Sequence, residues 1–475
     1  MEWSVINSLS RKKSISQLLS ETQGRDGLKK TLGALDLTML GIGAIIGTGI
    51  FVLTGVAAAK YAGPGLILSF IISGIACAFA ALVYAEFASS VPVAGSAYTY
   101  SYVSLGEFMA WIIGWDLMLE YLLAASTVSI GWSGYFQMLL NGFGIHLPVW
   151  ASGALGTAPG AVFNLPAVAI ALIITLLLSL GVKEAARFNN IIVFVKLGAV
   201  LLFILVAVWY VKPANWSPFL PFGVKGVLGG AAVVFFAYIG FDAVSTAAEE
   251  VKNPNRDMPI GIIASLIVCT VLYIVVSLIL TGIVPYQLLD VAAPVAFALS
   301  FIHQDWAAGI ISLGAIGGIT TVLLVMLYGQ TRVFFAMSRD GLLPKIFSNV
   351  HPKHKTPFVS TWLTGIVVAV IAGITPINTV AELVNIGTLS AFVLVSIGVI
   401  ILRKTQPDLP RSFRVPWVPL IPILAAVFCL FLMFQLPLIT WIRFFVWLII
   451  GFGIYFGYGI HHSVLGKADL SKQLK

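Results

Sequence analysis

The chain has 475 residues, of which 59% are hydrophobic and only 10% are charged, and its formal net charge is +8. A mean hydropathy of +1.01 lies far outside the range of soluble globular domains and predicts a protein embedded in lipid. The three cysteines lie in apolar runs, and no metalloprotease, phosphate-loop or nucleophile-elbow motif occurs in a plausible context, so the sequence predicts no disulfide framework, catalytic residue, metal site or cofactor.

Residues 1–35 are polar and basic and lack the apolar core of a cleaved signal peptide, so we expect a retained cytoplasmic segment. Beyond them, runs of about 20 apolar residues, the length that a helix needs to cross about 30 Å of hydrocarbon, predict an all-α polytopic membrane protein with twelve transmembrane helices. The expected spans are 36–59, 65–88, 107–139, 163–182, 187–211, 226–248, 258–284, 307–335, 357–374, 379–402, 417–435 and 440–461.

The basic residues predict the orientation of these spans. With both termini inside the cell, only Lys60, Lys212, Lys225 and Arg443 face the exterior, as the positive-inside rule requires. Topology therefore explains the positive net charge, and no nucleic-acid partner is predicted. We expect a multi-pass protein of the plasma membrane with lipids as partners, whose tail at 462–475 is cytoplasmic.

The first span carries four glycines within nine positions, Gly41, Gly43, Gly47 and Gly49. Because glycine weakens a helix interior, these residues must serve something other than helix stability. One interpretation is a packing face, since Gly43 and Gly47 form a GxxxG pair. The other is a discontinuous helix, with Gly41 and Gly43 as part of the break.

The sixth span repeats this feature, because Gly240 and Asp242 interrupt another hydrophobic segment. An offset of five spans between two discontinuous helices is typical of an inverted repeat with a binding site near the middle of the membrane. We therefore predict a first repeat over 36–211, a second over 226–402 and two additional helices over 417–461.

Broken backbone at membrane depth is tolerated only inside protein or around a water-filled cavity, so the breaks predict a ligand. Half-helices present free N–H groups at one end and free C=O groups at the other, which together suit the two charges of an α-amino acid. The predicted contacts of its carboxylate are the amides of Gly47, Thr48 and Gly49. The predicted contacts of its ammonium are the carbonyls of Ile45, Phe236, Ala237 and Ile239.

Four stretches of the chain carry a family resemblance. They are GIGAIIGTGIFVLTG (41–55), VPVAGSAYTYSYVSLGEFMAWIIGWDLMLEY (91–121), FFAYIGFDAVSTAAEEVKNPNRDMPIGI (235–262) and YGQTRVFFAMSRDGLLP (328–344). Together they resemble the cationic amino acid transporter family of the amino acid-polyamine-organocation (APC) superfamily. The resemblance implies a LeuT-like fold of two inverted five-helix repeats and alternating-access transport of L-amino acids. Animal members carry fourteen spans, so twelve spans make the chain similar to a bacterial homologue.

Lys196 lies inside the fifth span, with apolar residues on both sides. Its side chain could snorkel to the interface, but an ionisable residue inside a span more often marks a functional site. The resemblance implies a lysine that replaces a sodium ion and bonds a carbonyl of the first helix near Gly43. We therefore expect coupling to protons, with Lys196 as a group that can gain and lose one.

Three intramembrane acids are further candidates. Asp116 and Glu120 are four residues apart and share one helical face. We expect Asp116 to lie near the membrane boundary or to bond a neighbouring helix, whereas Glu120 and Asp242 are predicted to take part in proton coupling. Asp242 could also contact the substrate amine through water. Asp36 and Glu86 lie at span ends, where solvated or capping roles are expected.

The predicted pocket wall of Ile45, Phe236 and Met326 is apolar and bulky. It favours proton symport of a small neutral L-amino acid such as alanine. The alternative is uniport or exchange of a cationic amino acid, arginine or lysine. A channel is less consistent with the sequence because no repeated filter is visible, and an enzyme is less consistent because the intramembrane acids lack histidine or cysteine partners. Both a monomer and a dimer remain open.

Overall fold

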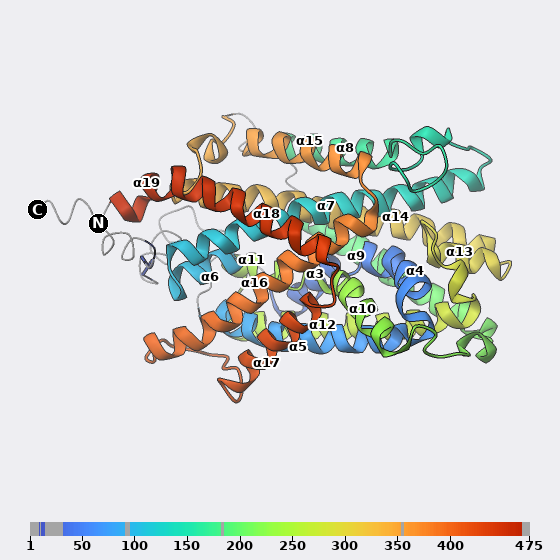
Figure 1. Cartoon of the computed structure of the whole chain (residues 1–475), viewed down its shortest axis with the longest axis horizontal. Helices are drawn as coiled ribbons and strands as arrows, with labels where there is room; N and C mark the ends of the chain where they lie inside the picture. The colour runs from blue at the N-terminus through green and yellow to red at the C-terminus, as the bar shows by residue number, and fades with distance from the viewer. Residues whose placement is uncertain are drawn as a thin grey trace, which may run out of the picture.

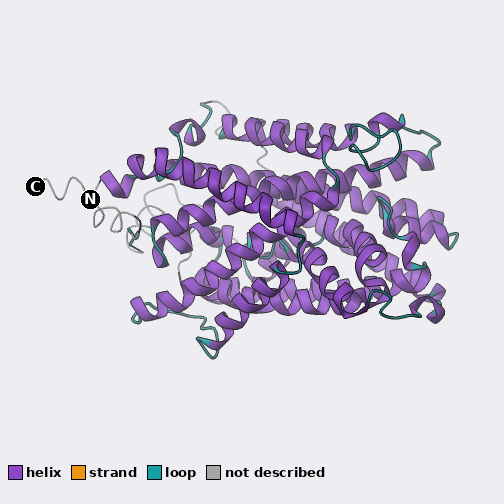
Figure 2. Cartoon of the chain, in the orientation of Figure 1, coloured by secondary structure: helices purple, strands orange, loops and turns teal. Residues whose placement is uncertain are grey.

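The computed structural model describes residues 9, 11–14, 32–90, 96–181, 185–352 and 356–467. Over these residues the chain is helical, without a β-strand (Figure 2). Among them, seven helical stretches are long and apolar enough to cross a membrane and five shorter helices are also apolar, and each of the predicted spans overlaps one of these stretches. The chain is therefore an all-helical, polytopic membrane protein.

Figure 1 shows the long helices running roughly along the longest axis of the molecule. The first half contains α3 (Ala34–Ile45), a π-helical turn (Gly49–Leu53), α4 (Thr54–Ala57), α5 (Leu66–Ser90), α6 (Ser96–Ser104), α7 (Glu107–Gly142), α8 (Leu165–Leu180) and α9 (Ala185–Ala207). The second half contains α10 (Gly223–Val234), a 3-10 turn (Phe235–Tyr238), α11 (Ala243–Thr246), α12 (Pro254–Ile283), α13 (Pro294–Phe301), α14 (Asp305–Arg339), α15 (Phe358–Ile374), α16 (Ile377–Thr405), α17 (Leu420–Met433), α18 (Leu438–Ile454) and α19 (Ile460–His462). Helices α6 and α19 lie at one end of the molecule, and α4 and α13 lie at the other (Figure 1).

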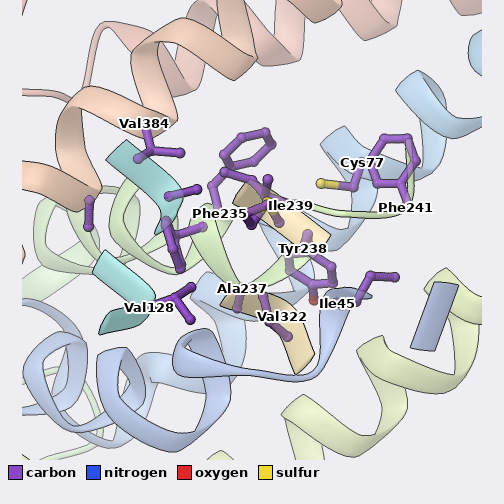
Figure 3. Close-up of a cluster of buried hydrophobic side chains, with 14 of the residues drawn as sticks. Ile45, Cys77, Val128, Phe235, Ala237, Tyr238, Ile239, Phe241, Val322 and Val384 are labelled. Carbon is purple, nitrogen blue, oxygen red and sulfur yellow. The ribbon is translucent and has the colours of Figure 1, made fainter. Parts of the chain in front are cut away.

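Long helices surround the short segments in the middle of the molecule. Helix α12 packs against α3, and α7 packs against both α14 and α16. Figure 3 shows buried valines of three of these helices, Val128 of α7, Val322 of α14 and Val384 of α16, converging on the segment 235–239. Because lipid tails are as apolar as these side chains, close packing holds such helices together.

Tryptophans fasten α18 to α7. The indole N–H of Trp115 donates to the carbonyl of Trp447 at 2.8 Å, and the indole N–H of Trp447 donates back to the carbonyl of Trp115 at 3.1 Å. Gly451 makes room for this contact, because a Cβ there would lie 2.5 Å from Cδ1 of Trp115. The last predicted span is therefore packed on the third.

The structure contradicts the expectation for Glu86 and confirms the one for Asp36. Glu86 is only 2% exposed and accepts two hydrogen bonds from Arg403, at 2.8 and 2.5 Å, and one from the amide of Val415 at 2.7 Å. The loop before α17 folds over the end of α5, so Glu86 is bound by the guanidinium of Arg403 in a bidentate pair and not by water. Asp36, in contrast, caps α3 by accepting from the amide of Gly33 at 2.9 Å.

The predicted N-terminal segment 1–35 lies mostly outside the described residues, as does the tail from residue 468. Where it is described, Lys13 forms a buried ion pair with Asp340 at 2.6 Å. The hydroxyl of Tyr98 donates to the second carboxylate oxygen of Asp340 at 2.7 Å. The N-terminal segment is therefore attached to the end of α14.

The backbone that leads into α3 pairs with the backbone that leads into α12. The amide of Leu32 donates to the carbonyl of Glu250 at 3.0 Å, and the amide of Lys252 donates to the carbonyl of Leu32 at 2.9 Å. These two bonds form an isolated β-bridge between Leu32 and Val251. The start of the first span is thus attached to the chain that follows the sixth.

Candidate functional site

Helix α3 ends inside the first predicted span. Its last residue is Ile45, the next residue Ile46 has extended backbone with φ −74° and ψ 105°, and helical backbone resumes at Thr48. The first amides of a new helical segment have no intrahelical acceptor. Gly47, Thr48 and Gly49 are buried at the start of this new segment. Their amides are the groups that the sequence predicts to contact a carboxylate.

The sixth predicted span is interrupted as well. Helix α10 ends at Val234, a 3-10 turn follows, and Ile239 is extended with φ −61° and ψ 133°. Gly240 has φ +120°, a backbone conformation that side chains rarely adopt. The carbonyls at the end of the first half of this span therefore lack the regular hydrogen-bond partners of an α-helix. Phe236, Ala237 and Ile239 are all buried.

The two interruptions pack directly against each other. A Cβ on Gly49 would collide with the backbone of Ala237, and a Cβ on Gly240 would lie 2.9 Å from the carbonyl carbon and oxygen of Ala44. Each interruption therefore holds a glycine that lets the other backbone approach closely. The same four residues bring the amides after the first break and the carbonyls before the second break to one place.

Tyr273 of α12 joins the two interruptions, and the sequence analysis missed it. Its hydroxyl lies 2.9 Å from the carbonyl oxygen of Ile45 and 2.7 Å from that of Ala237. A hydroxyl carries one proton, so it donates to one of these carbonyls at a time. The carbonyl of Phe236 also has a donor, the amide of Ile239 at 3.2 Å, so three of the four carbonyls predicted for the ammonium are already in contact with one. The available signal was a tyrosine in the middle of an apolar span, since a buried phenol usually finds a polar partner.

Lys196 of α9 reaches the first interruption. Its ammonium donates to the carbonyl of Gly43 and, at 3.0 Å, to that of Ile46, and the whole side chain is buried. Its stem passes Gly318 of α14, where a Cβ would lie 3.0 Å from Cβ of Lys196. The expected bond near Gly43 is therefore present, and the snorkelling alternative is wrong, because the ammonium binds protein carbonyls in the interior.

The three intramembrane acids are all buried. Glu120 and Asp242 are each 2% exposed and are close enough for their charges to interact. Asp116 accepts a hydrogen bond from Ser390 of α16 at 2.7 Å, and among the described residues its second oxygen has no partner. Asp116 thus bonds a neighbouring helix, while Glu120 and Asp242 form a buried pair of acids.

The glycines of the first span do not form one packing seam. Gly41 faces Ser265 of α12, where a Cβ would lie 2.6 Å from the serine Cβ, and Gly47 faces Val322 of α14 at 3.0 Å. The carbonyl of Gly43 faces α9. Because these contacts lead to three different helices, the GxxxG interpretation does not account for them.

Thr48 and Met326 complete the set of predicted contacts. The hydroxyl of Thr48 is buried and has no hydrogen-bond partner within the described part of the chain, and its methyl group packs on Gly131 of α7. Met326 is 3% exposed and lies one helical turn after Val322, the residue that faces Gly47. Buried polar groups normally have partners, so this hydroxyl is available to a polar ligand.

A family model described as amino acid permease matches residues 32–455. Two proteins of Bacillus subtilis (strain 168) are similar over nearly the whole length. The methylthioribose transporter is 59% identical over 462 residues, which cover 97% of this chain and 100% of that protein. The branched-chain amino acid permease BcaP is 61% identical over 467 residues, which cover 97% of this chain and 99% of that protein. The vacuolar cationic amino acid transporter 4 of Arabidopsis thaliana is 39% identical over 410 residues, which cover 85% of this chain and 68% of that protein.

Proposed function

The chain belongs to the amino acid permease family. We propose that it is a secondary active transporter that imports small neutral L-amino acids by proton symport. Its relatives are permeases and transporters, and it is not an enzyme. The observation that carries the proposal is the contact between two interrupted helices, because it brings the amides after the first break and the carbonyls before the second break to one buried place.

The proposed architecture has twelve membrane spans, with repeats over 36–211 and 226–402, a LeuT-like fold and the pair 417–461 outside the repeats. The interruptions support it, since they fall in the first and sixth spans, five spans apart. The basic residues support cytoplasmic termini in the plasma membrane.

In the proposed binding mode, the substrate carboxylate accepts hydrogen bonds from the amides at 47–49 and the hydroxyl of Thr48. The ammonium binds carbonyls of the second interruption, next to that of Ala237, which contacts Tyr273. The substrate side chain points at Met326. These partners are mostly backbone groups, so selection depends on the volume that the apolar wall leaves for the side chain.

Proton coupling is proposed to run through Lys196, Glu120 and Asp242. The ammonium of Lys196 holds two carbonyls at the end of α3, so a change in its charge alters the bonds at the first interruption. Glu120 and Asp242 are buried together, and two neighbouring carboxylates in low dielectric favour sharing a proton. Protons are thus the proposed coupling ion, and no cofactor takes part.

The function is tested by uptake of labelled alanine into proteoliposomes with an inward proton gradient and no sodium. We expect accumulation above the outside concentration, and competition by glycine and serine but not by arginine or lysine. The competitor panel holds the twenty amino acids and methylthioribose, since relatives transport branched-chain amino acids and methylthioribose according to their names. Competition by arginine would favour the cationic alternative, and equilibration without accumulation would favour a channel.

Met326→Ala should widen the substrate range toward longer side chains. Removing most of a buried side chain of α14 leaves room for further methylene groups, each contributing about 0.8 kcal/mol when buried, so inhibition of alanine uptake by leucine should strengthen about tenfold. The measurement is the concentration of leucine that halves uptake. Met337→Ala is the matched control, because Met337 is equally buried on α14 but packs against Gly114. An unchanged range in Met326→Ala would contradict the pocket assignment.

A further inference from the structure

A groove of about 570 Å³ lies away from the interruptions, at the N-terminal end of α12. One wall is a face of α12, and the other comes from the loop between α16 and α17. The apolar part of the lining consists of Pro259, Ile260, Ile263, Ala264, Ile267 and Phe413. Ile260 is 41% exposed and Ile267 is 58% exposed, so the groove opens to the surroundings of the helix.

The polar end of the groove is basic. Arg256 lies in the lining with Asn255 and Ser412, and none of the described residues that form the lining is acidic. Arg256 is exposed, and within the described residues its guanidinium forms no ion pair or hydrogen bond. Asp257, the adjacent acid, is buried. A free guanidinium therefore stands at one end of an apolar groove.

The α12 wall of the groove is about as long as one leaflet of hydrocarbon is thick. Helix α12 is long and apolar enough to cross a membrane, and it begins just before Arg256. The eleven-residue step from Arg256 to Ile267 rises about 16 Å, which is close to half of the roughly 30 Å hydrocarbon thickness. Arg256 thus lies at headgroup level, and the apolar lining continues to about the middle of the bilayer.

We propose that this groove binds one anionic phospholipid, with the phosphate on Arg256 and Ser412 and one acyl chain along Ile260, Ile263 and Ile267. A basic residue at the membrane surface attracts anionic headgroups, while the apolar wall has no preference among headgroups. The proposed orientation of the chain places the groove in the cytoplasmic leaflet. The preference for an anionic lipid is inferred from the lining residues alone.

The position gives this lipid a structural role. Arg256 is four residues after Lys252, whose amide holds Leu32 at the start of the first span. The opposite wall belongs to the loop whose Val415 is bound by Glu86 of α5. A lipid in the groove therefore joins the start of α12 to the loop before α17, next to the chain that leads into the interruption.

The test is native mass spectrometry of the purified full chain with added phosphatidylglycerol or phosphatidylethanolamine. We expect phosphatidylglycerol to bind about fivefold more tightly, the contribution of one basic residue near the surface. Arg256→Gln should remove this preference and leave the binding of phosphatidylethanolamine unchanged. Ala264→Phe, which fills the groove, should weaken both lipids.

Lys404→Gln is the matched control, because Lys404 is exposed at the end of α16 and is not part of the groove. This variant should keep the full preference for phosphatidylglycerol. Equal binding of the two lipids by the native chain, or an equal loss in Lys404→Gln and Arg256→Gln, would overturn the proposal. Displacement of phosphatidylglycerol by inorganic phosphate at equal concentration would also overturn it, since it would show a site for the anion alone. None of these readouts depends on transport.

Discussion

Lys196→Ala is expected to abolish proton-driven uptake of alanine, by at least about a hundredfold. The buried ammonium supplies the hydrogen bonds of two carbonyls at the end of α3, and each buried acceptor that loses its donor costs about 1–3 kcal/mol. The variant also lacks the group proposed to carry the proton. The measurement is initial uptake into proteoliposomes with an inward proton gradient and no sodium.

Two further variants separate coupling from damage to the fold. Lys196→Met keeps most of the side-chain volume without the charge, and it should also lose proton-driven uptake. Its melting temperature should lie closer to that of the native chain than the melting temperature of Lys196→Ala does. Lys225→Ala, at an exposed lysine near the start of α10, should transport normally. Sodium-dependent uptake that survives in Lys196→Ala would refute the proposed coupling.

Gly240→Ala is expected to destabilise the protein and to stop transport. At φ +120° a non-glycine residue costs about 1–3 kcal/mol of backbone strain. The new Cβ would also lie 2.9 Å from the backbone carbonyl of Ala44, which belongs to α3 and cannot rotate away as a side chain can. We expect a lower melting temperature in detergent, and no uptake by the fraction that remains folded.

Gly317→Ala provides the comparison for this substitution. Gly317 lies inside α14, and a Cβ there would have no neighbour within 4 Å. Alanine is favoured over glycine in a helix interior by about 1 kcal/mol, so this variant should be as stable as the native chain or more stable. If Gly240→Ala melted at the same temperature as Gly317→Ala, the close contact between the two interruptions would not be needed for stability.

The sequence predicted the helices and the interruptions because both depend on local patterns. Runs of apolar residues define the helices. A cluster of glycines inside the first span, and Gly240 with Asp242 inside the sixth, favour broken backbone. The contact between Lys196 and the end of α3 was expected from the family resemblance. The sequence also indicates a contact of this kind, because a lysine surrounded by apolar residues needs a polar partner inside the protein.

The features that the sequence analysis missed depend on partners far apart in the chain. Tyr273 contacts two interruptions from a third helix, and Glu86 is buried because Arg403 and the amide of Val415 reach it from another helix and loop. No periodicity in either segment identifies such partners. Two relatives about 60% identical to this chain carry names with different substrates, so overall sequence similarity does not identify the substrate.

The two interrupted helices are joined at more than one level. Gly49 lies against Ala237, Gly240 lies against Ala44, and Leu32 is hydrogen bonded on both sides of Val251. Neither segment can move alone without breaking these contacts, so a displacement of one interruption requires a displacement of the other.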